Sequence, residues 1–296
     1  MKYALIDMGS NSIRLSVYRT TQGHFERLFS EKHMAGLVNY IQEGALSQEG
    51  IDTACSILIE FQTLLKQFAL TSPKVFATAS LRNINNTSEA VSKIQQKTGL
   101  TVDVISGEEE ARLGCVGALH AVSIKNGYLF DIGGGSTELV SLKEGAVKSA
   151  QSIPVGSLNL FKSFVTKLWP KSKEQELIKN SIAQALEPLP KNQMPELCGT
   201  GGTARAMLKL VNHWYHRCEK SFSTDELNEI TNLLQSRSTQ ARDLILKKCP
   251  DRIHTILPGS LLMSALAKRL GSNIISVSEY GVREGYLCQK ILNNSI

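Results

Sequence analysis

The sequence predicts an α/β protein built from two duplicated halves, and three observations support this. Strand-like and helix-like segments alternate along the chain, which is typical of α/β domains. The length of 296 residues exceeds the usual size of one hydrophobic core, so two domains are expected. A motif near the start, YALIDMGSNSIRLSV, also returns as YLFDIGGGSTELV. At a constant spacing of 124 residues (131 minus 7), the paired positions are Asp7 and Asp131, Gly9 and Gly133, Ser12 and Ser136, and Leu15 and Leu139.

In the first half, two short apolar runs at 3–6 and 13–18 flank DMGSNS and predict two strands joined by a turn. Ser47 is a good N-cap for a long amphipathic helix that runs to Leu70. The segments that follow predict a strand at 74–80, a helix at 88–99 closed by Gly99, a strand at 101–106 and a helix at 107–122.

The second half repeats the opening strand, glycine turn and strand, with a third strand expected at 145–156. Helices are predicted at 157–169, 173–186, 223–237 (with Thr224 in a capping pattern), 259–271 and 283–292. A strand, glycine turn and helix are expected over 194–208, and a strand at 273–278. We therefore predict domains at 1–120 and 121–296.

Six scattered cysteines without a C-x-x-C pair argue against a disulfide framework or a zinc site, and we expect them to be reduced and buried. The start turns polar at Asp7, before a signal peptide would be complete, and no apolar run reaches the length of a membrane span. The sequence thus predicts a soluble cytoplasmic protein without a membrane partner.

Charge is distributed unevenly between the halves. Residues 1–150 hold 14 Lys+Arg and 15 Asp+Glu, a net of −1, whereas residues 151–296 hold 19 and 12, a net of +7. An excess of positive charge attracts acidic ligands such as nucleic acid, a nucleotide or a polyanion. The alternative is that a net charge of this size only keeps the protein soluble.

Both glycine turns have the composition of phosphate-binding loops. Glycines let successive backbone amides approach anion oxygens, and Ser and Thr hydroxyls add donors. Neither turn contains the Gly-Lys-Ser/Thr of a nucleotide-triphosphate loop, and a plain hairpin turn is the alternative for each. The run CGTGGTA, residues 198–204, matches a dinucleotide fingerprint only weakly, because the acidic residue that should follow lies in a hydrophilic segment.

Three consecutive carboxylates open the predicted helix at 107–122. Glu109 lies three residues after Ser106, as in a capping box, and Glu108 suits the positive end of the helix dipole. Glu110 instead shares a helical face with Leu113 and with glycines 114 and 117, a stripe expected to pack inward. This predicts Glu110 as a general base, with a solvent-facing glutamate as the alternative.

Other polar residues are less decisive. Arg82 follows a predicted strand and has the forked donors that suit a phosphate, although a surface arginine fits equally well. His213 and His216 have no carboxylate at metal-ligand spacing and are interpreted as structural.

Seven ordered motifs together resemble the exopolyphosphatase/guanosine pentaphosphate phosphohydrolase family. They are IDMGSNSIRL, TASLRN, ISGEEEARL, FDIGGGSTELV, GTGGTARA, PGSLL and EYGVREG, and they span nearly the whole chain. The resemblance implies two duplicated actin-like (ribonuclease H-like) ATPase-superfamily domains with phosphates bound in an interdomain cleft. The sequence departs from the family pattern at Asn159 and His254.

Residue by residue, the resemblance also implies functional roles. Glu110 would be the general base, Asp131 and Glu138 would organise Mg²⁺, and Arg82 would hold the phosphate chain. The phosphate loops would be formed by Asp7, Gly9, Ser10, Asn11 and Ser12 in the first half and by Gly133, Gly134, Gly135 and Ser136 in the second.

The resulting hypothesis is an exopolyphosphatase, a phosphoric anhydride hydrolase that removes the terminal phosphate of inorganic polyphosphate, with short chains preferred. The first alternative is a guanosine pentaphosphate 5′-phosphohydrolase with the same site. A non-catalytic polyphosphate- or nucleotide-binding regulator is the second, and a sugar or acetate kinase of the superfamily is the third. No nucleic-acid partner is expected, and family members are commonly homodimers.

Overall fold

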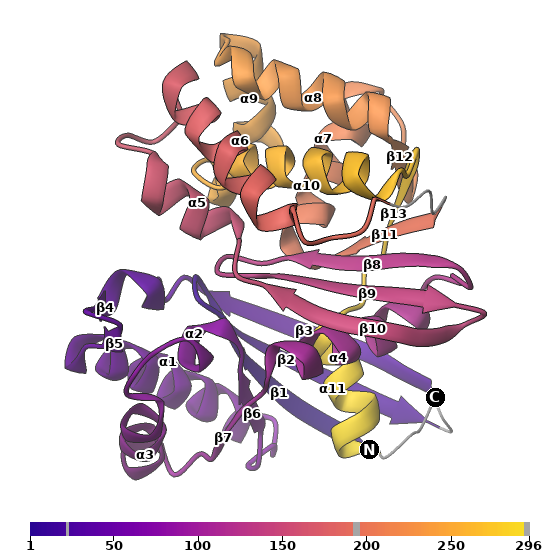
Figure 1. Ribbon diagram of the computed structural model, residues 1–296. Coiled ribbons are helices and arrows are strands. Elements are labelled where there is room, and N and C mark those ends of the chain that lie inside the picture. The colour runs from indigo at the N-terminus through magenta and orange to yellow at the C-terminus, as the bar shows by residue number, and fades with distance from the viewer. Residues whose placement is uncertain (22–23, 192–195, 293–296) are drawn as a thin grey trace. The chain divides into compact units, whose positions relative to one another are not determined.

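The computed structural model describes residues 1–21, 24–191 and 196–292, and it divides into two compact units, Met1–Gly107 and Glu108–Ile296 (Figure 1). We call them the first and second units and describe each separately. The helix that begins at Gly107 lies in the second unit by this division, whereas the predicted domain boundary at residue 120 follows that helix. In the described part of the chain, no helix is long and apolar enough to cross a membrane.

The first unit contains a five-stranded sheet in the order β3-β2-β1-β6-β7. Its strands are β1 (Lys2–Met8), β2 (Ile13–Thr21), β3 (His24–His33), β6 (Lys74–Ala77) and β7 (Val102–Val104). β2 pairs antiparallel with both β1 and β3, whereas β1, β6 and β7 run parallel. Parallel neighbours place their carboxyl ends at one edge of the sheet, where the loop after β1 also lies.

Helices α1 (Gln48–Gln67) and α3 (Thr87–Thr98) pack against this sheet and share its apolar core. The Ser47 hydroxyl caps α1 by accepting from the Gly50 amide at 3.3 Å, and Gly99 ends α3 in the left-handed conformation, as predicted. Short elements complete the unit, namely η1 (Leu37–Tyr40), β4 (Ile41–Gln42), β5 (Ala45–Leu46) and α2 (Ala79–Arg82).

The second unit contains a six-stranded sheet in the order β10-β9-β8-β11-β13-β12. Its strands are β8 (Gly127–Ile132), β9 (Thr137–Lys143), β10 (Ala146–Ile153), β11 (Glu196–Thr200), β12 (Ser221–Ser223) and β13 (Ile274–Val277). In the order β10-β9-β8-β11-β13, five of these strands repeat the order and directions of the first sheet. β12 adds an antiparallel strand at the edge beside β13. This repetition confirms the duplication predicted from the two glycine motifs.

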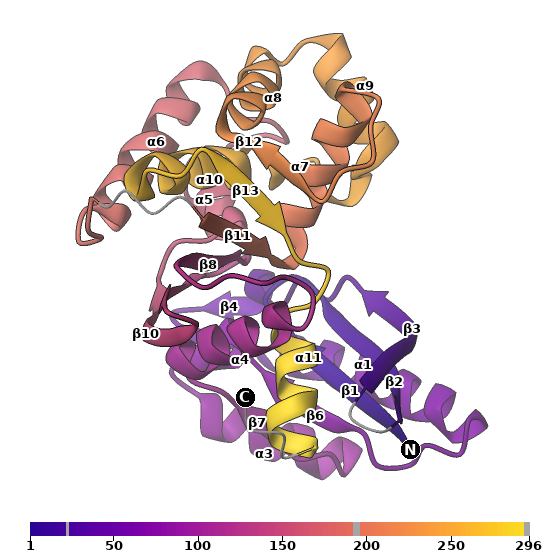
Figure 2. The same cartoon turned by 90° about the vertical axis from the view of Figure 1, so that its right-hand side faces the viewer.

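Two groups of helices cover opposite faces of the second sheet (Figure 2). One face packs against α5 (Ser157–Phe164), α6 (Ser172–Leu186), α7 (Gly201–Trp214), α8 (Thr224–Ser236), α9 (Thr239–Lys248) and α10 (Ile256–Leu270). The other face packs against α4 (Gly107–Leu119), which lies beside α11 (Val282–Tyr286) and the π-helical turn η3 (Leu287–Ile291). Alternate residues of β8, such as Leu129 and Phe130, enter the two cores.

Several local predictions were wrong. The strand predicted at 74–80 ends at Ala77 and turns into α2, so Arg82 lies on a helical turn. The helix predicted at 157–169 ends at Phe164, because Val165 is extended and the Thr166 amide and hydroxyl donate to Glu174. α8 is capped by Ser223, not Thr224, in a box with Glu226.

Some elements were not predicted at all, among them β3, α9 and β12. β3 has mostly polar, partly exposed side chains, so it lacks an apolar alternation, and α9 and β12 are short. The cysteines are all unbridged, and five are buried as expected, but Cys218 is exposed. Residues 194 and 195, at the start of one predicted strand, lie outside the described residues.

Candidate active site

The two glycine motifs form matching hairpin turns. In the first unit the Gly9 amide donates to the Ser12 carbonyl at 3.0 Å, and in the second the Gly133 amide donates to the Ser136 carbonyl at 2.9 Å. The same register precedes each turn, with Asp7 opposite Arg14 and Asp131 opposite Glu138.

The carbonyls of the second loop are held from behind by α5. The Ser157 amide donates to Gly133 O at 2.9 Å, and the Leu158 and Asn159 amides donate to Gly134 O, each at 3.0 Å. The Asn159 side chain also donates to Gly135 O at 3.0 Å, so this departure from the family pattern supports the loop. The carbonyls of Gly133, Gly134 and Gly135 are therefore all bonded to α5.

The first loop is supported in the same way by the segment that follows β3. The Gly36 amide donates to Asn11 O at 2.9 Å and the Val38 amide donates to Ser10 O at 3.1 Å. The two loops therefore share backbone geometry, although η1 replaces α5 behind the first.

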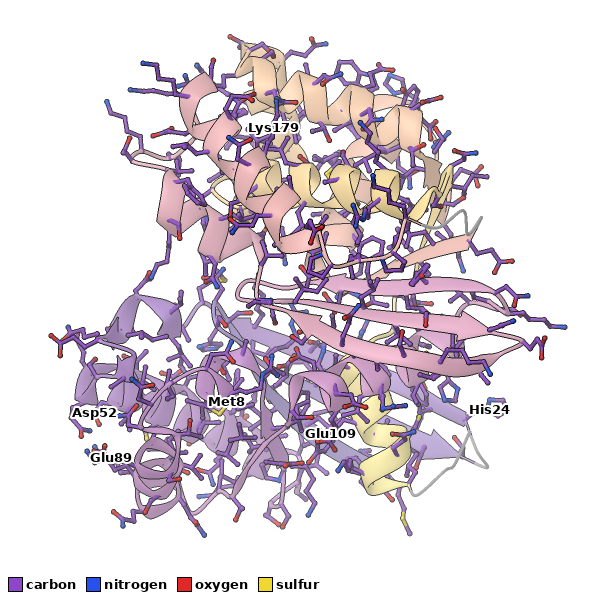
Figure 3. The ribbon with its side chains drawn as sticks, viewed as in Figure 1. Met8, His24, Asp52, Glu89, Glu109 and Lys179 are labelled. Carbon is purple, nitrogen blue, oxygen red and sulfur yellow. The ribbon has the colours of Figure 1, made fainter. Side chains whose placement is uncertain are left out.

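Glu110 is buried on α4 with only 9% of its surface exposed, which agrees with the prediction from its helical face. The other two carboxylates of the run point elsewhere. Glu108 pairs with Arg112 at 2.9 Å, and Glu109, labelled on α4 in Figure 3, pairs with Lys290 at 2.5 Å. Glu110 is thus the carboxylate of the three that enters the protein interior.

A small pocket in the second unit brings Glu110 together with two other predicted site residues. We call it the carboxylate pocket. It is lined by Glu110, Ala111, Gly114, Cys115, Leu129, Phe130, Asp131, Glu138, Val140 and Thr200. Three acidic side chains thus line one pocket among apolar neighbours.

Asp131 lies at the end of β8, where the Thr200 hydroxyl lies 3.1 Å from Oδ2 and can donate to it. Burial raises the pKa of Asp131 above its usual value. The influences that oppose this rise come, in order, from Arg205, the Thr200 hydrogen bond, Arg252 and Arg283. This carboxylate is therefore held in a cation-rich corner of the unit.

The turn between β11 and α7 closes around that corner. Gly201 has φ +73°, and a Cβ there would lie 1.9 Å from Asp131 Oδ1. A Cβ on Gly202 would lie 1.9 Å from Nη2 of Arg252. Gly201 is therefore required by its positive φ as well as by the lack of space, whereas a side chain at Gly202 would displace the flexible end of Arg252.

Glu138 is 4% exposed, and its Oε1 accepts hydrogen bonds from the hydroxyls of Ser136 and Ser152, each at 2.7 Å. Ser136 was predicted to bind phosphate, and its hydroxyl donates to Glu138 in this structure.

The described residues contain no group of three or more His, Cys, Asp or Glu side chains placed to hold a metal ion. Asp131 and Glu138, opposite one another on β8 and β9, nevertheless fit Mg²⁺ by donor chemistry. Mg²⁺ keeps several waters and is usually bound by one or two carboxylates together with substrate phosphates.

Arg82 is the last residue of α2, in the first unit. Its Nη1 donates to the Ile105 carbonyl at 3.3 Å. The turn that carries it is joined to β1, because the Thr78 amide and the Ser80 hydroxyl both donate to the Met8 carbonyl, just before Gly9.

The structure thus gathers the predicted residues into one group in each unit. Asp7, Gly9, Ser10, Asn11, Ser12 and Arg82 lie in the first, and Glu110, Asp131, Gly133, Gly134, Gly135, Ser136 and Glu138 lie in the second. Sequence reasoning missed Thr200 and Ser152, which bond to the two pocket carboxylates. Thr200 was detectable as a hydroxyl at the end of a strand before a glycine pair.

The fold and the pocket define a duplicated α/β protein, as predicted from the sequence, with three carboxylates that line one pocket of the second unit. The chain belongs to the Ppx/GppA phosphatase family, whose model matches residues 16–294. Membership makes it a phosphoric anhydride hydrolase.

Relatives and solved structures agree with this assignment. Exopolyphosphatase 1 of Mycobacterium tuberculosis and that of Mycobacterium bovis are each 23% identical over 304 residues, covering 98% of this chain and 88% of theirs. An exopolyphosphatase structure from Cytophaga hutchinsonii has a TM-score of 0.88 at 23% identity and covers 100% of this chain and 99% of its own. A Ppx/GppA family structure from Aquifex aeolicus has a TM-score of 0.83 at 24% identity, with the same coverage.

Proposed function

We propose that this enzyme hydrolyses the terminal phosphoanhydride bond of inorganic polyphosphate, with short chains preferred. The observation that carries the proposal is the carboxylate pocket, where buried Glu110 lies with Asp131 and Glu138. The names of the mycobacterial and Cytophaga relatives support polyphosphate as the substrate.

In this proposal Glu110 is the general base. It accepts a proton from a water molecule, and the water oxygen attacks the terminal phosphorus in line, so that the P–O bond to the rest of the chain breaks. Proton transfer by a positioned side chain contributes typically about 10²–10⁴-fold to a rate. Phosphoryl transfer otherwise depends on positioning and charge stabilisation, so no covalent nucleophile is required.

The glycine loops would hold the non-bridging oxygens. The carbonyls of Gly133 and Gly134 bond to α5, which leaves the loop amides as the donors for an anion. Asp131 and Glu138 would hold Mg²⁺, which would neutralise charge on the phosphate oxygens when bound. The roles of Arg82 and of the first loop rest on the family resemblance.

The test is phosphate release by the purified chain from polyphosphates of graded length and from guanosine pentaphosphate, with and without Mg²⁺. We expect the largest kcat/KM on short polyphosphates and no turnover after chelation of the metal. A larger kcat/KM on guanosine pentaphosphate than on polyphosphate would identify the nucleotide as the preferred substrate. Binding of polyphosphate without any release would identify a regulator and overturn the proposal.

A further inference from the structure

Strand β10, which the proposed chemistry does not involve, contributes a hydroxyl that bonds to Glu138, one of the residues that line the carboxylate pocket. β10 pairs antiparallel with β9, so that Ser152 lies opposite Glu138 and Ser149 lies opposite Ser141. The Ser152 hydroxyl donates to Glu138 Oε1 at 2.7 Å, whereas the Ser149 and Ser141 hydroxyls bond to each other at 2.6 Å on the exposed part of the strands.

Two hydroxyls converge on the same oxygen of Glu138. Ser136, in the glycine loop, also donates to Oε1 at 2.7 Å. An ionised carboxylate only accepts hydrogen bonds, and each of its oxygens has about two lone-pair sites. Two serine hydroxyls thus hold Oε1 in place, and this favours Oε2 as the oxygen that would meet a cation.

The other acidic residue of the hairpin has a similar arrangement. Asp131 lies opposite Glu138, and its Oδ2 lies 3.1 Å from the hydroxyl of Thr200 on β11, the strand on the other side of β8. Each carboxylate therefore has a hydroxyl donor from the neighbouring strand. Outer groups of this kind orient the ligands of metal sites.

We propose that Ser152 is a positioning residue, which fixes the Glu138 carboxylate so that Oε2 serves as its cation ligand. The proposal rests on the proposed function insofar as Glu138 is assigned to a divalent cation. Ser152 itself contacts neither cation nor substrate. Its effect is therefore on cation affinity rather than on the proton transfer assigned to Glu110.

The test compares Ser152→Ala with Ser149→Ala, the same change on the same strand. Mn²⁺ binding to each purified chain without substrate is measured by electron paramagnetic resonance, and the Mg²⁺ concentration for half-maximal phosphate release is measured separately. We expect Ser152→Ala to weaken both about 10–100-fold. Ser149→Ala should match the unsubstituted chain, and Ser152→Thr, which keeps the hydroxyl, should restore binding.

Thermal melting separates positioning from damage to the fold. If Ser152→Ala lowers Tm no more than Ser149→Ala while Mn²⁺ affinity falls, the positioning role is supported. Equal Mn²⁺ affinity in the two variants, or no Mn²⁺ binding by the unsubstituted chain, would overturn it. Absence of hydrolysis with an intact Mn²⁺ difference would refute the proposed function alone.

Discussion

The loops Gly9–Ser12 and Gly133–Ser136 share a backbone but differ in the side chains around them. Each closes with a glycine amide bonded to a serine carbonyl, and each has carbonyls tied to the segment that follows a third strand. The residue opposite the aspartate, however, is Arg14 in the first unit and Glu138 in the second. Duplication thus preserved a backbone suited to anions, while one change of charge made a carboxylate pair in the second unit alone.

This difference assigns distinct tasks to the units. In the second unit, Asp131 and Glu138 line one pocket with Glu110. The first unit holds a loop with Arg14 opposite its aspartate, and Arg82 bonded to the Ile105 carbonyl. Three pairs of substitutions test the roles proposed for these residues, in order of expected effect.

The largest effect is expected for Glu110→Gln, which removes the proposed base and keeps the shape of the side chain. kcat should fall about 10²–10⁴-fold, because the amide cannot accept the proton. The control is Glu109→Gln on the same helical turn, where the carboxylate pairs with Lys290 at the surface. Steady-state phosphate release measures both, and equal kcat values for the two variants would place the base elsewhere.

An intermediate effect is expected for Gly201→Ala. This residue has φ +73° and lies against Asp131, whereas Gly145, in the β9–β10 turn, has φ +77° and no atom within 4 Å of the place that a Cβ would take. Alanine in the left-handed region costs roughly 1–2 kcal/mol, so both variants should melt earlier. Only Gly201→Ala should also lower kcat/KM. Full activity in that variant would show that the Asp131 position is not critical.

The smallest effect distinguishes the twin serines. Ser136→Ala removes a hydroxyl that donates to Glu138. Ser12→Ala removes the corresponding hydroxyl of the first loop, where Arg14 takes the place of Glu138 in the strand register. We expect kcat on polyphosphate to fall about 10-fold for Ser136→Ala, the lower end for a group that orients a metal ligand, and less for Ser12→Ala. The reverse order would assign the more demanding role to the first loop.

The sequence by itself determined the duplication and the pocket residues with local signatures. Asp7 and Asp131 recur at one spacing, and the hairpins they open have the same register because both depend on a short glycine turn between strands. Glu110 was distinguishable from Glu108 and Glu109 because a helical face is a matter of spacing along the chain. Its burial on α4 agrees with that argument.

Only the tertiary structure decided which hydroxyls serve the carboxylates. Ser152 reaches Glu138 because β10 pairs with β9 in one register, and Thr200 reaches Asp131 because β11 lies parallel to β8 across a crossover of many residues. β3 was likewise not recognisable, since its polar side chains give no pattern without the neighbouring strand. Strand pairing joins residues distant in sequence, and the local pattern of the chain does not encode which strands become neighbours.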